Sequence, residues 1–262
     1  MKKKTVDKSS IAQAWLLISA IILISLTSFM LMGDIRFFPS LDLSSDVAQF
    51  YYWITETASF PFAIITTFII ISFCAFRIPR PLMKKLIPAL IISLLLSLGL
   101  GQLIKVTTKE IRPNIALMTQ YHLLNMDTFN HLDKSDRQQA MAQAIPKLEA
   151  IDPNIQLSSQ INKHWQSTTN YAFPSGHMLF AVTLTLIINY YLIQSGAVVL
   201  PILLMIWSVL ISLSRLFLGL HWPQDILAAT LLSIISVTIG LYATEKYLTH
   251  SNGSRRQKSP PN

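Results

Sequence analysis

The stretch LIPALIISLLLSLGLGQLIKV, from Leu86 to Val106, contains a single charged residue, Lys105. A run of about 20 apolar residues is long enough to cross the hydrocarbon core of a bilayer as one helix. Runs that approach or reach this length also occupy residues 11–32, 52–76, 175–194, 197–214 and 224–243. Because a backbone in lipid must satisfy its own hydrogen bonds, each run is expected to be helical. The sequence therefore predicts an all-α integral membrane protein with six transmembrane helices.

The composition agrees with a membrane protein. Of the 262 residues, 52% are hydrophobic and only 13% are charged, whereas soluble domains carry about 25% charged residues. The formal net charge is +8. Its cations cluster at the ends of the apolar runs, where they orient helices and meet lipid headgroups, so no nucleic-acid partner is expected. Cys74 is the only cysteine, which excludes an intrachain disulfide.

The distribution of Lys and Arg predicts the orientation of the chain. The first run is long enough to span, and Phe37-Phe38-Pro39 follows it where a signal peptide would have a small-residue cleavage site, so we interpret it as an uncleaved anchor. The opposite loop, 33–51, holds Arg36 against three aspartates. Most basic residues near apolar runs fall on the other side: Lys2, Lys3, Lys4, Lys8, Arg77, Arg80, Lys84, Lys85, Lys246, Arg255, Arg256 and Lys258. Both termini are therefore predicted to be cytoplasmic.

Residues 113–173 form a long polar segment, predicted to be a small, partly helical extracytoplasmic insert between the third and fourth spans. An amphipathic helix is expected from Asp133 to Ala150, capped by Asp133 and broken near Pro146. The short connection 194–196 is expected to turn a tight helical hairpin. Residues 1–250 would then form one six-span domain, followed by a disordered cytoplasmic tail, 251–262.

Three short polar segments stand at the edges of the apolar runs. The first runs from Lys105 to Arg112-Pro113, with six residues between Lys105 and Arg112. The second is Pro174-Ser175-Gly176-His177. The third begins with Ser214-Arg215 and continues, after five residues, to His221 and, after three more, to Asp225. With six spans, the third and fifth runs end at the outer surface and the fourth and sixth begin there, so all three segments share one face. They supply three cations, two histidines and one carboxylate, with no cysteine cluster or acidic metal cage. This set suits an enzyme that holds a phosphate group and attacks it with nitrogen.

His221 and Asp225 are spaced i and i+4, which places them on one helix face if the helix starts near His221, with Pro223 as an early helical residue. A carboxylate bound to one ring nitrogen fixes the tautomer and leaves the other nitrogen as a base or nucleophile. The alternative is an interfacial histidine beside a helix cap.

The other two segments carry the features of an anion site. Ser175 and Gly176 open a membrane helix, whose free N–H groups attract anions, and His177 is a candidate general acid. Lys105, Arg112 and Arg215 would neutralise the phosphate. The alternatives are ordinary capping by Ser175, a passive histidine, and cations that end their helices at the headgroups.

The three segments together match the three-part signature of the type 2 phosphatidic acid phosphatase superfamily, which the chain resembles at every signature position. The six-span layout, the long external insert and four further phrases resemble bacterial members of that superfamily. The phrases are Trp53-Ile54-Thr55-Glu56, His164-Trp165-Gln166, Tyr171-Ala172-Phe173-Pro174 and Gly219-Leu220-His221-Trp222-Pro223.

The resemblance implies a lipid phosphatase that needs no metal or other cofactor. It implies that His221 attacks phosphorus to form a phosphohistidine, that Asp225 orients it, and that His177 protonates the leaving group. The phosphate would be bound by Lys105, Arg112, Ser175, Gly176 and Arg215. Glu56, a carboxylate in the second predicted span, is a further functional candidate as a headgroup contact or a partner for a buried cation.

The expected enzyme hydrolyses phosphatidylglycerol phosphate to phosphatidylglycerol and phosphate in a bacterial inner membrane, with its site on the periplasmic face. Undecaprenyl pyrophosphate, phosphatidic acid, lysophosphatidic acid and diacylglycerol pyrophosphate are further candidate substrates. Three alternatives remain open: a lipid phosphotransferase, a dedicated undecaprenyl-diphosphate phosphatase, and a non-catalytic transporter or scaffold. The oligomeric state does not follow from the sequence.

Overall fold

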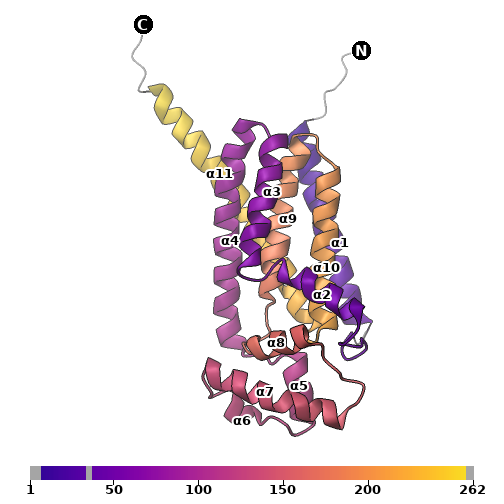
Figure 1. The fold of residues 1–262 in the computed structure, drawn as a ribbon. Helices are drawn as coiled ribbons and strands as arrows, with labels where there is room; N and C mark the ends of the chain where they lie inside the picture. Colours follow the sequence, from indigo (N-terminus) through magenta and orange to yellow (C-terminus); the bar gives the residue numbers. More distant parts are fainter. Residues whose placement is uncertain (1–6, 34–36, 258–262) are drawn as a thin grey trace.

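The computed structural model describes residues 7–33 and 37–257, with side chains to Tyr247 (Figure 1). Within these ranges the regular structure is entirely helical. The helices are α1 (Lys8–Met32), α2 (Asp46–Glu56), α3 (Phe62–Arg77), α4 (Arg80–Thr108), α5 (Pro113–Gln120), α6 (Met126–Phe129), α7 (Lys134–Ile151), α8 (Ser159–Ser167), α9 (Gly176–Gln194), α10 (Val199–Phe217) and α11 (Pro223–Gln257). The all-α prediction is therefore confirmed.

A bundle of long apolar helices forms one part of the molecule. In the described ranges, five helices are long and apolar enough to cross a membrane: α1, α4, α9, α10 and α11. α9 is the central helix and packs against the other four. The outer helices expose large apolar side chains; Leu17, Phe68 and Leu95 are 61%, 71% and 70% exposed. Such a surface is unfavourable in water and suits a lipid environment.

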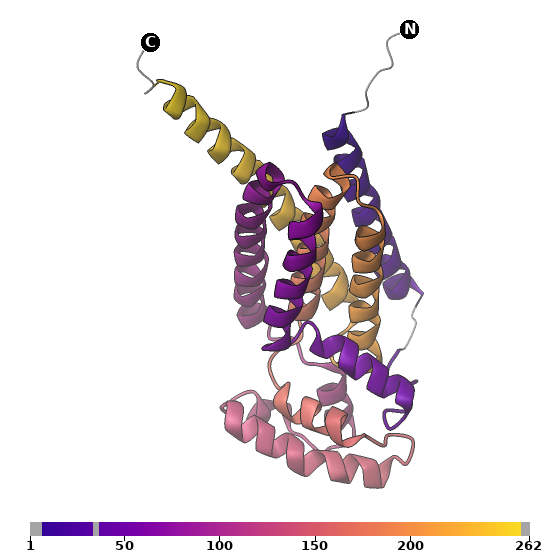
Figure 2. The same ribbon diagram turned by 45° about the horizontal axis from the view of Figure 1, so that its top comes forward.

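The predicted second span is not one helix. α2 ends at Glu56 and α3 begins at Phe62, so the expectation of a continuous helix over residues 52–76 was wrong. Pro61 lies at the break; proline cannot donate a backbone hydrogen bond and disfavours helix in the residue before it. α3 is a shorter apolar helix of 16 residues, and α2 lies across the end of the bundle, beside the insert (Figures 1 and 2).

The insert is a small helical layer at one end of the bundle, made by α5 to α8 (Figure 2). Asp133 caps α7 by accepting the amide hydrogen of Asp136 at 3.0 Å, as predicted. The expected break at Pro146 is absent, because α7 continues to Ile151. Its neighbours Ile145 and Leu148 are fully buried. This packing outweighs the single backbone hydrogen bond that proline removes.

The insert has an apolar core of its own, which includes the loop between α10 and α11. This second core contains Met118, Ile145, Leu148, Trp165, Leu218 and Leu220 among its buried residues. The indole Nε1–H of Trp165 donates to the carbonyl oxygen of Leu218 at 2.9 Å. The insert therefore packs directly on the loop that leads to His221.

The first turn of α1 and the last turns of α11 lie at the end of the bundle opposite the insert (Figure 1). The hairpin between α9 and α10 turns at Gly196, with φ 85°, as expected. α11 continues to Gln257 and so enters the segment for which we expected a disordered tail. The described residues leave out 1–6, 34–36 and 258–262, which hold part of the charge pattern behind the predicted orientation. The disordered tail and the cytoplasmic location of both termini therefore stay predictions.

Candidate active site

The structure brings the three polar segments together at the insert end of the bundle. Arg112 of the first segment contacts His221 of the third, with Nη1 3.1 Å from Nε2. Ser175 of the second segment donates its backbone N–H to the carbonyl oxygen of Asp225 at 3.2 Å. Lys105 and Arg215 are buried in the same region. Positions far apart in sequence therefore form one site.

His221 is held in a defined tautomer. Its Nδ1 lies 3.0 Å from Oδ2 of Asp225, and the same oxygen accepts the backbone N–H of Trp222 at 2.9 Å. Arginine can only donate, so the Nε2 that faces Arg112 must accept, and the proton stays on Nδ1. Burial, followed by the charges of Arg112, Arg215 and Lys105, places the pKa of His221 well below its usual value. The ring is therefore a neutral imidazole with its Nε2 lone pair directed at a cation.

Arg112 and Lys105 are held by oxygen atoms of the segment before α9, and Arg112 also by a carbonyl of the α10–α11 loop. Arg112 donates to the backbone oxygen of Asn170 at 2.7 Å, to its Oδ1 at 2.6 Å, and to Leu220 O at 2.7 Å. Lys105 Nζ donates to Tyr171 O at 2.8 Å. These cations are anchored inside the protein rather than extended to headgroups, which contradicts the snorkelling alternative.

Several polar atoms at the site have no hydrogen-bond partner. Arg215 is completely buried, yet its Nε and Nη2 are unpaired, and the hydroxyl of Ser175 is unpaired as well. Ser175 makes no side-chain cap to α9, so the ordinary capping alternative does not hold. Buried donors normally have partners, and a group of unpaired donors indicates a place for an anion. Asp225 Oδ1 is a buried acceptor that also lacks a partner.

A cavity of about 990 Å³ opens beside Arg112 and His221, which line it, and reaches Gly176, the neighbour of Ser175. Its lining includes His177, His221, Lys105 and Arg112 from the polar segments, and Gly176, above which a side chain would meet open space. Other walls come from the bundle, from the α2–α3 connection, and from the insert: Leu98, Gln102, Phe180, Ser59, Phe60, Lys134, Arg137, Thr168 and Asn170. The cavity thus has room for a substrate much larger than a phosphate ion.

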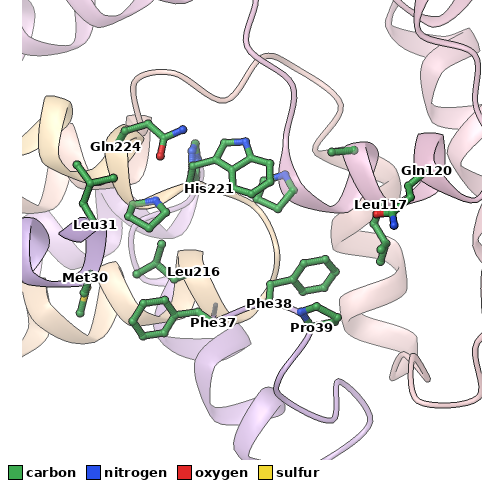
Figure 3. A pocket seen from close by; sticks show the side chains of 14 residues that line it. Met30, Leu31, Phe37, Phe38, Pro39, Leu117, Gln120, Leu216, His221 and Gln224 are labelled. Atoms are coloured by element: carbon green, nitrogen blue, oxygen red, sulfur yellow. The ribbon is translucent and has the colours of Figure 1, made fainter. Parts of the chain in front are cut away.

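A second cavity, of about 490 Å³, lies on another side of His221 (Figure 3). Its walls are mainly apolar and include Phe37, Phe38 and Leu216. The larger cavity, in contrast, is lined by both histidines of the polar segments, His177 and His221, and by two of their cations, Lys105 and Arg112.

The sequence analysis did not predict the contacts that four further side chains make at the site. Ser59 Oγ lies 2.9 Å from His177 Nε2, and Thr55 Oγ1 accepts from Arg215 Nη1 at 3.1 Å. His164 contacts Arg215, and Asn170 holds Arg112. Thr55, His164 and Asn170 stand in or next to phrases that carried the family resemblance. Ser59 had no such signal, because a serine near an apolar run is common.

Glu56 lies at the end of α2 rather than within a continuous span. Its Oε1 is 3.2 Å from His164 Nδ1, and both side chains are largely buried, at 14% and 10% exposure. The carboxylate thus reaches Arg215 only through His164.

A sequence profile described as the PAP2 superfamily matches residues 87–248 of the chain. The chain belongs to the PAP2 superfamily. The match contains all three polar segments, from Lys105 to Asp225, whereas Thr55, Glu56 and Ser59 precede it.

Two relatives match most of the chain, and a third matches a shorter part. Phosphatidylglycerophosphatase B of Escherichia coli (strain K12) is 29% identical over 199 residues, which are 74% of this chain and 75% of that protein. Phosphatidylglycerophosphatase B of Haemophilus influenzae is 30% identical over 201 residues, 72% of this chain and 80% of that protein. An undecaprenyl-diphosphatase of Sulfolobus acidocaldarius is 39% identical over 79 residues, but these are only 27% of this chain and 34% of that protein.

Proposed function

We propose that the chain is a membrane phosphatase that removes a terminal phosphate from phosphatidylglycerol phosphate through a phosphohistidine on His221. One observation carries the proposal: a neutral His221, oriented by Asp225, lines a large cavity together with Lys105 and Arg112, and the same group of residues holds the unpaired donors of Arg215 and Ser175. A nucleophile with donors around it is the arrangement that phosphoryl transfer needs. Membership in a phosphatase superfamily supports it.

In the first step Nε2 of His221 attacks phosphorus, and the bond from phosphorus to the lipid oxygen breaks. His177 enters this step in its protonated form, gives one proton to the leaving oxygen and becomes neutral. The N–H of Arg112 that contacts Nε2 then donates to a phosphoryl oxygen instead. Arg112, Lys105 and Arg215 together neutralise the negative charge of the phosphoryl oxygens. Nδ1 keeps its proton, and Asp225 compensates the positive charge that the ring acquires.

In the second step water attacks phosphorus and the P–N bond breaks. His177, now neutral, accepts a proton from the water, and inorganic phosphate leaves. His221 returns to its neutral form. Each step moves one proton and one phosphoryl group, and His221, His177, water and the substrate supply every atom involved.

The substrate class follows from the placement of the site. The cavity has polar walls around the histidines and apolar walls such as Leu98 and Phe180 from the bundle, which suits a phosphorylated lipid headgroup with its chains in the bilayer. The names of the two long matches favour phosphatidylglycerol phosphate. The shorter match makes undecaprenyl diphosphate the second candidate substrate. Phosphatidic acid, lysophosphatidic acid and diacylglycerol pyrophosphate present the same terminal phosphate.

We further propose six membrane crossings, with α3 as the sixth. α3 spans roughly 24 Å at 1.5 Å per residue, slightly less than the hydrocarbon core. An even number of crossings agrees with the first turn of α1 and the last turns of α11 lying on the same side of the bundle, opposite the insert (Figure 1). With the basic end in the cytoplasm, the insert caps the site on the periplasmic side of a bacterial inner membrane.

The test is phosphate release by purified protein in detergent, with and without EDTA, from each of these five lipids. We expect release in both conditions and none from His221→Ala. If wild-type protein released no phosphate from any of them, the proposal would be wrong. Labelled phosphate that appears on an added acceptor lipid, rather than in water, would indicate the phosphotransferase alternative. A scaffold would show neither outcome, and the intact signature argues against it.

A further inference from the structure

A second chain of carboxylate, imidazole and guanidinium lies beside the proposed nucleophile. Glu56 Oε1 is 3.2 Å from His164 Nδ1, and His164 Nε2 is 3.3 Å from Arg215 Nη1. Asp225, His221 and Arg112 follow the same order of atoms, at 3.0 and 3.1 Å. The two chains come from different helices, since Glu56 lies on α2, His164 on α8 and Arg215 on α10.

The direction of each hydrogen bond in this chain is determined by chemistry. Arginine only donates, so Nε2 of His164 must accept, and its single proton lies on Nδ1, toward Glu56. Burial is the main cause that lowers the pKa of His164; the bond to Glu56 opposes it and the charge of Arg215 adds to it. The neutral ring can therefore accept from Arg215 while the carboxylate holds it in place.

Arg215 is held along one edge only. Its Nη1 donates to His164 and to Thr55, the residue before Glu56, whereas its Nε and Nη2 are buried without partners. A guanidinium is planar, so anchoring Nη1 determines where the other donors point. The anchors belong to α2 and α8, and the unpaired donors belong to a guanidinium whose charge acts on His221, the proposed nucleophile.

We propose that Glu56 and His164 are positioning residues that hold Arg215 so that its unpaired edge binds the transferred phosphoryl group, an inference that rests on the proposed phosphatase function. A carboxylate in contact with the phosphate itself would repel it. Glu56 and His164 both line the cavity, but Oε1 of Glu56 is bound to Nδ1 of His164, so the carboxylate adds negative charge near the buried cation without binding the phosphate. Neither residue acts on the reacting atoms, and both act through Arg215.

The test measures orthovanadate, a phosphate mimic, as an inhibitor of phosphate release in wild-type protein and variants. Glu56→Leu should weaken vanadate binding roughly 10- to 100-fold, the effect of losing a hydrogen bond to a charged group. Glu56→Gln keeps an oxygen that can accept from His164 Nδ1–H, and should bind vanadate within about threefold of wild type. Glu245→Gln is the matched control: it neutralises a carboxylate that pairs with Lys85 at 2.8 Å and should not change vanadate binding.

A double-mutant cycle separates positioning from general destabilisation. If Glu56 acts through Arg215, Glu56→Leu should have less than about a threefold effect in an Arg215→Lys background. Independent, multiplicative effects would overturn the inference, as would unchanged vanadate binding by Glu56→Leu. His164→Phe repeats the test if Glu56→Leu does not fold, because its ring keeps the contact with Tyr52 but cannot accept from Arg215. Wild-type protein that neither releases phosphate nor binds vanadate would instead refute the proposed function.

Discussion

Asp225→Asn is the sharpest test of how His221 is activated. The amide keeps the shape of the carboxylate, and its oxygen can still accept the two N–H groups that Asp225 Oδ2 now accepts, from His221 Nδ1 and from the Trp222 backbone. The backbone oxygen of Asp225, which accepts from Ser175, is unchanged. The substitution therefore removes mainly the negative charge behind the nucleophile.

The size of the effect follows from what that charge does. A hydrogen bond to a charged group contributes about 1.5–3 kcal/mol. Two charges about 4 Å apart interact by about 4 kcal/mol at an effective dielectric constant of about 20. The positive charge on the phosphorylated ring would lose this compensation, so we expect kcat to fall roughly 100- to 1000-fold, at about 1.4 kcal/mol per tenfold.

The assay is single-turnover phosphate release from phosphatidylglycerol phosphate in detergent, with acid-labile protein-bound phosphate measured in parallel. Asp152→Asn is the control, because that carboxylate accepts the Tyr121 hydroxyl on the insert, at 2.9 Å and outside the site. In Asp225→Asn the amide nitrogen takes the place of Oδ1 of Asp225, which has no partner, so the melting temperatures of this variant and of wild type are compared as well. A folded Asp225→Asn protein with turnover within about threefold of wild type would refute the reasoning.

Three further outcomes are expected. Arg112→Lys should lower kcat/KM at least about 100-fold, because one ammonium cannot replace the donors that hold Asn170 and Leu220 and face His221; near-normal phosphate-release kinetics would contradict this. Gly219→Ala should destabilise the protein by roughly 1–2 kcal/mol, measured by thermal unfolding, because φ is +68° and a Cβ would meet the Phe38 ring; an unchanged melting temperature would count against it. The His221 pKa lies well below its usual value of 6.5, so its ring stays neutral as the pH falls through 6.5. In a pH profile, kcat/KM should therefore fall on the acid side only well below that pH. A fall in kcat/KM centred at 6.5 would contradict the burial argument.

The sequence predicts the proposed reaction centre better than it predicts the groups around it. His221, Asp225, His177 and the cations were recognisable because three separated segments match one signature in order and are predicted to share one face of the membrane. Glu56 was recognised because a carboxylate within an apolar run is rare. Its link to Arg215 through His164 could not be predicted, because it depends on how α2 and α8 pack at the end of α10.

Prolines show why the helix boundaries were less predictable. Pro61 marks the end of one helix and the start of another, whereas Pro88 lies inside α4 and Pro146 inside α7 without ending them. Each removes one backbone hydrogen bond. At Pro146 the buried neighbours Ile145 and Leu148 keep the helix in place. Local sequence contains the proline but not the packing that decides its effect.

The apolar core of the insert has a consequence for how the enzyme depends on its surroundings. In lipid, helices associate through close packing, whereas a core formed in water depends on the hydrophobic effect. The loop that carries Leu218 and Leu220 belongs to the second kind of core, while Arg215 and Asp225 sit at the ends of bundle helices. In the proposed topology, His221 therefore lies where these two kinds of packing meet. Its position would depend on both, so we expect an additive that weakens the hydrophobic effect to displace the proposed nucleophile while the bundle in the bilayer stays folded.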